Sequence, residues 1–469
     1  MKYRFENDSL GPKKVPSDAY RGIFTERALE NFQLSQHKGR KEIFRAYIKL
    51  KIACAKANSD LNLLSKPECN AIIKACDEAL YGKFDSEFSL DVFQAGAGTA
   101  YNMNVNEVIA NRANELLKKP KGKYFPVHPN NHVNLGQSSN DLGPSAIKLM
   151  VLEKLPFLLR ELISLQKSFE KKSKQFNKIK KSGRTHLQDA VPVTLGQEFK
   201  AYSENLKKHF SRIRDSEKFL KKIPLGGTAT GTGLNSHPKF RQKSLQHLRR
   251  ITKINFESAH LMENQMFSSD FYVFSSLLSV LCVDLNKICN DLNLLSSGPN
   301  TGLNEISFPE AEPGSSIMPG KVNPSICEAT QMACFYVIGL NHSIELSSQA
   351  GQLELNVFTP LIAYCLSDSL EVLSNALRMF NNKVVSGIKA NKEICEQYFL
   401  NSLGLATILN PLIGYSKAAE IFKEAKKRNL SVIEIILEKK LIPEKDLEIL
   451  LNYRNSTSPN LDLINKLKK

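Results

Sequence analysis

Apolar residues recur at a spacing of three and four over long stretches of this chain, and that period predicts amphipathic helices. The stretches lie at residues 39–58, 143–177, 191–221, 239–252, 265–297, 325–350 and 356–384. Several are more than twice as long as a usual helix of about 11–12 residues. Strand-like alternation of apolar and polar residues is scarce. The pattern therefore predicts an all-α fold built from long packed helices.

Polar, glycine-rich segments separate these stretches and are expected to be loops. They cover residues 94–107, 128–141, 182–192, 226–235 and 297–324, and each is dense in Ser, Thr, Asn, Gln or His. Simple connections need only about 4–6 residues. Long ordered loops on a rigid scaffold tend to carry function, so we expect the chemistry of this protein to lie in them.

The pattern changes near residue 390, where the helical stretches shorten and the turn pairs Asn410-Pro411 and Ile442-Pro443 follow. We therefore expect three domains. They are a helical N-terminal domain over residues 1–140, a central long-helix bundle over 141–390 and a small helical C-terminal domain over 391–469.

Composition is that of an ordinary soluble globular chain, with 42% hydrophobic and 24% charged residues among 469. The formal net charge is +17, which would suit a polyanion or a small anionic substrate. The basic residues are scattered among acidic and apolar ones, and no basic motif interleaved with aromatic residues is found. We therefore expect no nucleic-acid partner, and a non-catalytic polyanion-binding scaffold is a distant alternative.

Nine cysteines occur without any Cys-x-x-Cys pair, and most lie in apolar helical stretches. This usage is typical of buried thiols in a reducing compartment. The first residues contain no apolar segment of the kind that signal peptides have. The longest uncharged run, residues 398–416, is interrupted by polar residues, Gly and Pro. We therefore expect a cytoplasmic protein with no membrane span.

The polar loops contain many neutral hydrogen-bond donors and one lysine. These are Thr99, Ser138, Ser139, Asn140, Thr185, Asn323 and Lys321. Carboxylates accept several hydrogen bonds, and the bonds to charged groups are the strong ones, so this set suits a carboxylate substrate. No metal is expected, because Pro129 separates His128 and His132 from a shared helical face.

Residues 314–323 read GSSIMPGKVN and raise the question of what the two serines do. A nucleophilic serine would need a neighbouring base, and the Gly-x-Ser-x-Gly elbow is absent. A serine can also act as a base, if loop amides and Lys321 stabilise its alkoxide. A turn-forming role is the third alternative.

The same ten residues resemble the signature of the fumarase/aspartase superfamily. Segments 96–113, 128–141, 183–199, 226–235 and 351–358 match the family in the same order, and the resemblance spans essentially the whole chain. It implies a three-domain all-α fold and a homotetramer with a helical core, whose active sites each use loops from three subunits. It also implies reversible elimination from a small dicarboxylate to give fumarate, with no organic cofactor.

By position, the resemblance implies that Ser315 removes the Cβ proton and that Lys321 and Asn323 stabilise the resulting aci-carboxylate. It implies that Thr185 and His186 bind the substrate and that Glu328 pairs with the histidine. The remaining residues would hold a carboxylate and the leaving group; they are Thr99, Ser138, Ser139 and Asn140.

The resemblance leaves two leaving groups open. Segments 94–98 and 351–356, and Asp270, resemble the aspartate ammonia-lyases of the family. Segments 137–141 and 184–186 suit the class II fumarases, which release water from L-malate. The balance favours elimination of ammonia from L-aspartate, with class II fumarate hydratase as the alternative.

Overall fold

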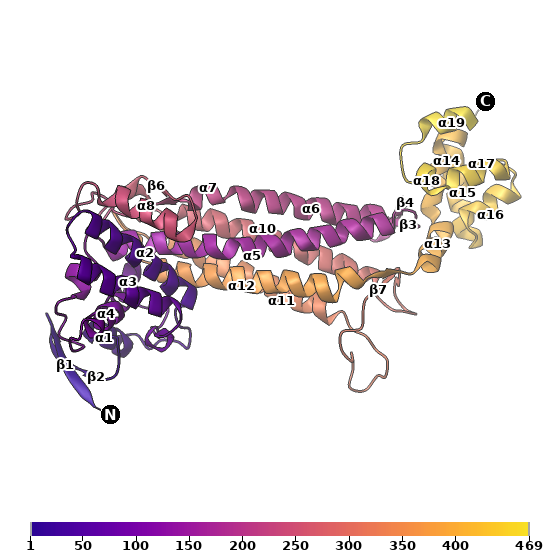
Figure 1. Ribbon diagram of the computed structural model, residues 1–469. Coiled ribbons are helices and arrows are strands. Elements are labelled where there is room, and N and C mark those ends of the chain that lie inside the picture. Colours follow the sequence, from indigo (N-terminus) through magenta and orange to yellow (C-terminus); the bar gives the residue numbers. More distant parts are fainter. Residues whose placement is uncertain (1, 468–469) are drawn as a thin grey trace. The chain divides into compact units, whose positions relative to one another are not determined.

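The computed structural model describes residues 2–467 and is mostly helical (Figure 1). It contains two compact units, each assembled from three separate stretches of the chain. The first unit comprises Met1–Leu159, Ser211–Cys282 and Phe335–Ser374, and the second comprises Arg160–Phe210, Val283–Cys334 and Asn375–Lys469. Five long helices contribute to both units, because the unit boundaries fall inside them.

Short helices of the first unit surround α2, which packs against α3 and α8, while α4 packs against α1 and α3. Ser65 and Glu68 begin α3 with a reciprocal capping box, which satisfies the first free N–H groups of the helix. The helices of this unit are α1 (Ile23–Asn31), α2 (Lys41–Asp60), α3 (Lys66–Leu80), α4 (Thr99–Leu116), α7 (Glu217–Leu220), α8 (Phe240–Thr252) and α9 (Leu261–Met266).

The long helices are α5 (Ser139–Gln175), α6 (Leu195–Asp215), α10 (Ser269–Leu295), α11 (Ser325–Gln349) and α12 (Thr359–Lys383). Within the second unit, the Phe169 ring of α5 lies 5.8 Å from the Phe199 ring of α6 and 6.3 Å from the Phe380 ring of α12. Buried aromatic rings at such distances supply much of the apolar surface that a bundle removes from water.

The C-terminal helices have a hydrophobic cluster that includes Phe399, Ile421, Ile435 and Leu450. They are α13 (Lys392–Asn401), α14 (Ala406–Ile413), α15 (Tyr415–Arg428), α16 (Val432–Glu438), α17 (Glu444–Leu451), α18 (Tyr453–Ser456) and α19 (Leu461–Leu467). The three domains expected from the sequence, with boundaries at residues 140 and 390, stay a prediction.

The helical period in the sequence located the main helices correctly. Stretches 39–58, 143–177, 239–252, 325–350 and 356–384 correspond to α2, α5, α8, α11 and α12. Stretch 265–297 contains α10, and stretch 191–221 is helical only from Leu195 onward, because residues 191–194 belong to a strand. The expectation of buried thiols is also confirmed, since all nine cysteines are buried and free.

Residues 2–467 also contain four two-stranded sheets, which the all-α expectation did not include. Three are antiparallel, and β5 pairs with β6 in parallel. They are β1 (Tyr3–Asp8) with β2 (Gly11–Pro16), β3 (Lys180–Thr185) with β4 (Gln188–Thr194), β5 (Lys222–Ile223) with β6 (Glu257–Ser258), and β7 (Ile306–Ser307) with β8 (Lys389–Ala390). The β3–β4 pair covers most of residues 182–192, so the prediction of a loop there was wrong. Its strands contain Lys, Arg, Gly and Pro and so lack the alternation typical of strands.

The predicted loop at 94–107 is also wrong from Thr99 onward, where α4 begins. Asparagine has a low helix propensity and favours turns, so a segment rich in it looks like a loop. In the fold Asn104 and Asn106 are fully buried, and Asn104 Nδ2 donates to the Glu87 carbonyl at 3.1 Å. Tertiary hydrogen bonds of this kind outweigh the unfavourable propensity.

Candidate active site

The structure brings Thr99, Ser138, Ser139 and Asn140 together in the first unit. Thr99 begins α4 and Ser139 begins α5, and their hydroxyl oxygens are 3.0 Å apart. The Asn140 N–H donates to Ser138 Oγ at 3.2 Å. Helix N-termini present free N–H groups and a favourable dipole to anions. Two of them with hydroxyl and amide side chains suit one carboxylate group of a substrate.

Thr185 and His186 lie in the second unit, at the tip of the β3–β4 hairpin. Thr185 pairs with Gln188 across a turn whose two central residues, His186 and Leu187, have φ values of 53° and 60°. Left-handed backbone is unfavourable for residues other than glycine, asparagine or aspartate, and such strain concentrates at functional sites. The turn leaves Thr185 and His186 exposed, where a ligand can reach them.

Residues 314–323 form a closed loop in the second unit. The Gly314 N–H donates to the Lys321 carbonyl at 2.9 Å, and Asn323 Nδ2 donates to the Gly314 carbonyl. Inside the loop, Ser315 Oγ accepts the N–H groups of Ile317 at 3.3 Å and Met318 at 3.0 Å. Ser315, Lys321 and Asn323 are therefore presented by one self-contained segment.

Glu328 is exposed in the first turn of α11, in the second unit. Among residues 2–467, no hydrogen bond or ion pair joins Glu328 to His186, or joins the Ser315 loop to the Thr185–His186 turn. Each of the three groups of predicted residues is thus preformed in one chain. Their union into one site stays a prediction.

Sequence reasoning missed Glu305, which is fully buried and lies between the hairpin with Thr185 and His186 and the Ser315 loop along the chain. Its carboxylate pairs with Lys181 Nζ at 2.7 Å and with Arg184 Nη1 at 2.9 Å, both from β3. Glu305 directly precedes β7, from which the Ser315 loop leaves. One carboxylate therefore ties the base of the hairpin with Thr185 and His186 to the base of that loop. An acidic residue in a polar segment looks exposed, and no sequence signal marked it as buried.

Sequence reasoning also missed Lys51, a fully buried lysine of α2 beneath the residues that lead into Ser138. Its Nζ donates to Asn134 Oδ1 at 2.8 Å and to Gln137 Oε1 at 3.0 Å. Burial lowers the pKa of Lys51 to about 7, because an ammonium group loses its hydration there.

This pKa predicts a pH-dependent stability. The unfolded chain holds the Lys51 proton up to about pH 10.5, while the folded chain releases it near pH 7, so the free energy of unfolding rises with pH across that interval. Relative to Lys51→Met, we expect wild-type stability to increase from pH 7 to pH 9 by at most about 1.4 kcal/mol per pH unit. Urea unfolding at several pH values measures this, and a constant difference would contradict it.

The described residues contain no group of three or more His, Cys, Asp or Glu side chains that could hold a metal ion. The two histidines at the π-helical turn Pro129–Val133 use Nδ1 to accept backbone N–H groups, His132 from His128 at 2.8 Å and His128 from Asn130 at 3.1 Å. Their placement serves the turn.

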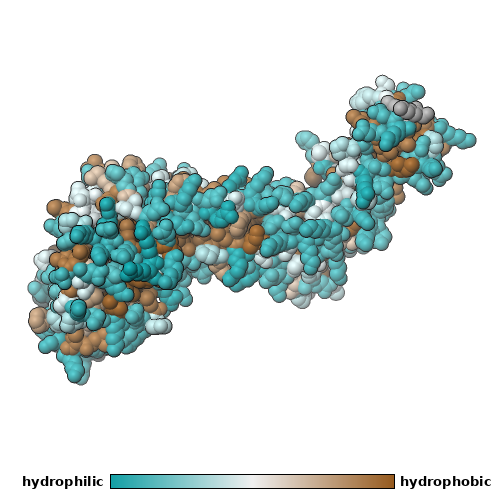
Figure 2. All heavy atoms as spheres, turned by 45° about the horizontal axis from the view of Figure 1, so that its top comes forward, coloured by the Kyte–Doolittle hydropathy of each residue, from teal (hydrophilic) through white to brown (hydrophobic). Residues whose placement is uncertain are grey.

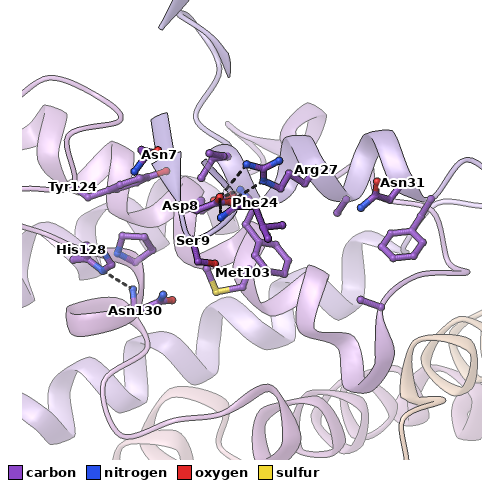
Figure 3. Close-up of a pocket in the computed structure, with 17 residues that line it drawn as sticks. Asn7, Asp8, Ser9, Phe24, Arg27, Asn31, Met103, Tyr124, His128 and Asn130 are labelled. Atoms are coloured by element: carbon purple, nitrogen blue, oxygen red, sulfur yellow. Dashed lines mark hydrogen bonds and ion pairs between the residues drawn. The ribbon is translucent and has the colours of Figure 1, made fainter. Parts of the chain in front are cut away.

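A pocket of 620 Å³ lies in the first unit, between the β1–β2 turn, α1 and the turn at His128 (Figure 3). Arg27 makes two hydrogen bonds to the Asp8 carboxylate at 2.8 and 2.9 Å, and Met103 also lines the pocket. None of the predicted site residues lines it. The predicted site residues are thus separate from this cavity.

Comparisons with known proteins cover nearly the whole chain. Residues 11–339 match the family model described as lyase, and residues 405–457 match that of the fumarase C C-terminus. An aspartate ammonia-lyase of Helicobacter pylori is 44% identical over 460 residues, which cover 97% of this chain and 98% of that protein. A class II fumarate hydratase of the same species is 44% identical over 450 residues, covering 96% and 97%. The crystal structure of a fumarate lyase:delta crystallin from Brucella melitensis bound to cobalt is 41% identical, with a TM-score of 0.94 over 98% of this chain and 100% of that chain.

Proposed function

Because this chain belongs to the fumarase/aspartase family of lyases, we propose that it is an aspartate ammonia-lyase, converting L-aspartate to fumarate and ammonia. The observation that carries the elimination chemistry is the environment of Ser315. Its Oγ accepts two backbone N–H groups of its own loop, at 3.0 and 3.3 Å. Hydrogen bonds to the charged form of a group favour that form, and a proton-abstracting serine needs its alkoxide.

In the first step, Ser315 Oγ takes the Cβ proton of aspartate, and the electron pair of that C–H bond moves into the adjacent carboxylate. This carboxylate becomes a dianion, the aci-carboxylate. Lys321 and Asn323 offset the added charge with an ammonium group and an amide donor. In the second step the electron pair returns to form the Cα–Cβ double bond, the Cα–N bond breaks, and ammonia leaves.

The other carboxylate and the leaving group fall to the residues at the helix N-termini. Thr99, Ser139 and Asn140 offer hydroxyl and amide groups beside the starts of α4 and α5. Thr185 and His186 complete the contacts from the hairpin turn, and Glu328 pairs with His186. These assignments follow the family resemblance residue by residue.

The choice of ammonia over water rests on the segments at 94–98 and 351–356. Gln352 in the second segment stands where the fumarases of the family usually have histidine. Class II fumarate hydratase is the second candidate. It is favoured by Gln-Ser-Ser-Asn-Asp at 137–141, and overall identity to the two enzyme types is the same, 44%.

Ultraviolet absorbance of fumarate distinguishes the candidates. We expect absorbance to rise when the protein is incubated with L-aspartate and to stay constant with L-malate. A rise with malate alone would make the protein a fumarase. Constant absorbance with both substrates would favour another lyase activity or the polyanion-binding scaffold.

We also propose a homotetramer that shares its active sites among subunits. Among the described residues, α10 is the one helix long and apolar enough to cross a membrane, a property that bundle-core helices share. Large apolar side chains are exposed along α10 and α11, and brown patches interrupt the polar surface over the long helices (Figure 2). The exposed apolar side chains of these two helices include Val280, Val283, Leu294, Met332, Phe335 and Leu346. Contact with other copies would remove this surface from water.

A further inference from the structure

The glycine-rich segment 226–235 has no part in the elimination chemistry above, yet it is bound tightly to the Ser138–Asn140 turn. Asp141, which is fully buried, makes the connection. One of its carboxylate oxygens accepts the Ser138 N–H at 2.9 Å, and the other accepts the N–H groups of Gly226 at 2.9 Å and Thr228 at 3.2 Å. A single carboxylate thus fixes both segments.

These bonds belong to a closed circuit of hydrogen bonds in the first unit, which we call the hydrogen-bond ring. It passes through residues 97–99, 138–141, 226–229, 265 and 356–357. It includes the bond between Thr99 Oγ1 and Ser139 Oγ and the bond from Asn140 Nδ2 to the Ala229 carbonyl at 2.7 Å. The remaining members, in order, are Gln265 Nε2 to Thr228 O at 2.8 Å, Asn356 N to Gln265 O at 3.0 Å and Ala97 N to Val357 O at 2.8 Å.

Backbone strain in the ring indicates that its geometry is enforced. Thr228 is β-branched and has a φ of 54°, and Ala97 has a φ of 58°. Such conformations persist only where the surroundings over-determine them. The bonds from Asp141 and Gln265 to Thr228 are the constraints that do so at this position.

A buried lysine lies beneath the same residues. Lys51 donates to Asn134 and Gln137, which lead into Ser138. Burial raises the pKa of Asp141 to about 6, and the backbone hydrogen bonds and the neighbouring Lys51 act against that rise. The segment with the substrate-binding groups is therefore held by the hydrogen bonds of Lys51 on one side and by the ring on the other.

We propose that Asp141 is a positioning residue for the reaction. It fixes the Ser138–Asn140 turn against the glycine-rich segment, so that the hydroxyls of Thr99 and Ser139 and the Asn140 side chain meet the substrate as a preformed group. The proposal rests on the proposed function for the identity of the reaction, but it concerns the binding of fumarate, which both candidate reactions share.

Asp141→Asn tests this at constant size. The amide keeps one acceptor oxygen and places an NH₂ group against at least one backbone N–H that the carboxylate now accepts. We expect the Kd for fumarate, measured by calorimetry, and the KM of the substrate that the wild type turns over to rise about tenfold to a hundredfold, because small misplacements of binding groups are costly.

Glu107→Gln is the matched control. Glu107 is also a buried carboxylate that accepts three backbone N–H groups, from Gly22, Phe24 and Thr25, but it lies outside the ring. We expect it to lower the melting temperature while leaving Kd and KM within twofold. Equal Kd and KM values in the two variants would overturn the proposal and make Asp141 a structural residue only.

Gln265→Met opens the ring at another bond and covers the case in which Asp141→Asn does not fold. It removes the donor to Thr228 O at similar side-chain volume, and the same rise in Kd is expected. An unchanged Kd in a folded Gln265→Met protein would also overturn the proposal. A wild type that turns over malate alone refutes the aspartate assignment and leaves this measurement intact. A wild type that does not bind fumarate refutes both.

Discussion

Replacing Ser315 by alanine should reduce kcat for fumarate formation about 10²–10⁴-fold and leave the fold unchanged. The substitution removes the proposed base, and positioned proton transfer contributes about 10²–10⁴-fold to a rate. Ser315 lies in a surface loop and makes its hydrogen bonds only within that loop, so the melting temperature should change little. Fumarate absorbance and thermal unfolding measure the two effects.

Ser316→Ala is the matched control, because it deletes the same hydroxyl from the neighbouring exposed residue. We expect it to keep most of the activity. If Ser315→Ala loses less than tenfold, or if the two variants are equally impaired, serine is not the base.

The Ser315→Ala variant also tests whether active sites are shared between subunits. In the proposed homotetramer, Ser315→Ala alone and Thr185→Val alone should each abolish activity. If the two loops come from different subunits, unfolding and refolding a mixture should produce some sites with both loops intact and restore activity. Complete inactivity of the mixture would contradict shared sites.

Replacing Glu305 by alanine should destabilise the protein by about 3–5 kcal/mol, the usual cost of breaking a buried ion pair from one side. The change removes the carboxylate that pairs with Arg184. It also leaves Lys181, which now pairs with both Glu305 and Glu198, with Glu198 alone. We expect the midpoint of urea unfolding to fall sharply. Activity of the folded fraction should fall too, because the hairpin and the Ser315 loop lose a common anchor.

Glu396→Ala is the control for this second prediction. Glu396 pairs with Lys180 at 2.9 Å, also on β3, but its side chain is 44% exposed. Exposed pairs contribute about 0–1 kcal/mol. Similar losses of stability in Glu305→Ala and Glu396→Ala would show that burial does not set the energy of the Glu305 pairs.

The long helices were predictable because their apolar spacing extends over many turns, and no other regular structure has that period. Segments whose structure depends on distant partners were not. The helix from Thr99 needs buried hydrogen bonds for its asparagines, and β3 needs Glu305, about 120 residues away, to hold its cations. A local pattern contains no information about such partners.

The candidate site shows the same division. Motif resemblance marked the residues with side chains that face a ligand, such as Ser315 and Asn140. It did not mark the buried charges beneath them, Lys51, Asp141 and Glu305, because a charged residue in sequence looks exposed whatever its environment. Burial and hydrogen-bond geometry were needed to find them.

The nine buried cysteines also make the molecule a reporter of its own opening. The thiolate is the form of cysteine that attacks a thiol reagent, and burial raises the pKa of Cys54 and of Cys395 to about 12. The closed molecule should therefore be nearly inert to such a reagent. Cys54 lies in α2 and Cys395 in α13, in different units. The order in which peptides containing these residues become labelled will thus reveal which unit opens first, without any engineered probe.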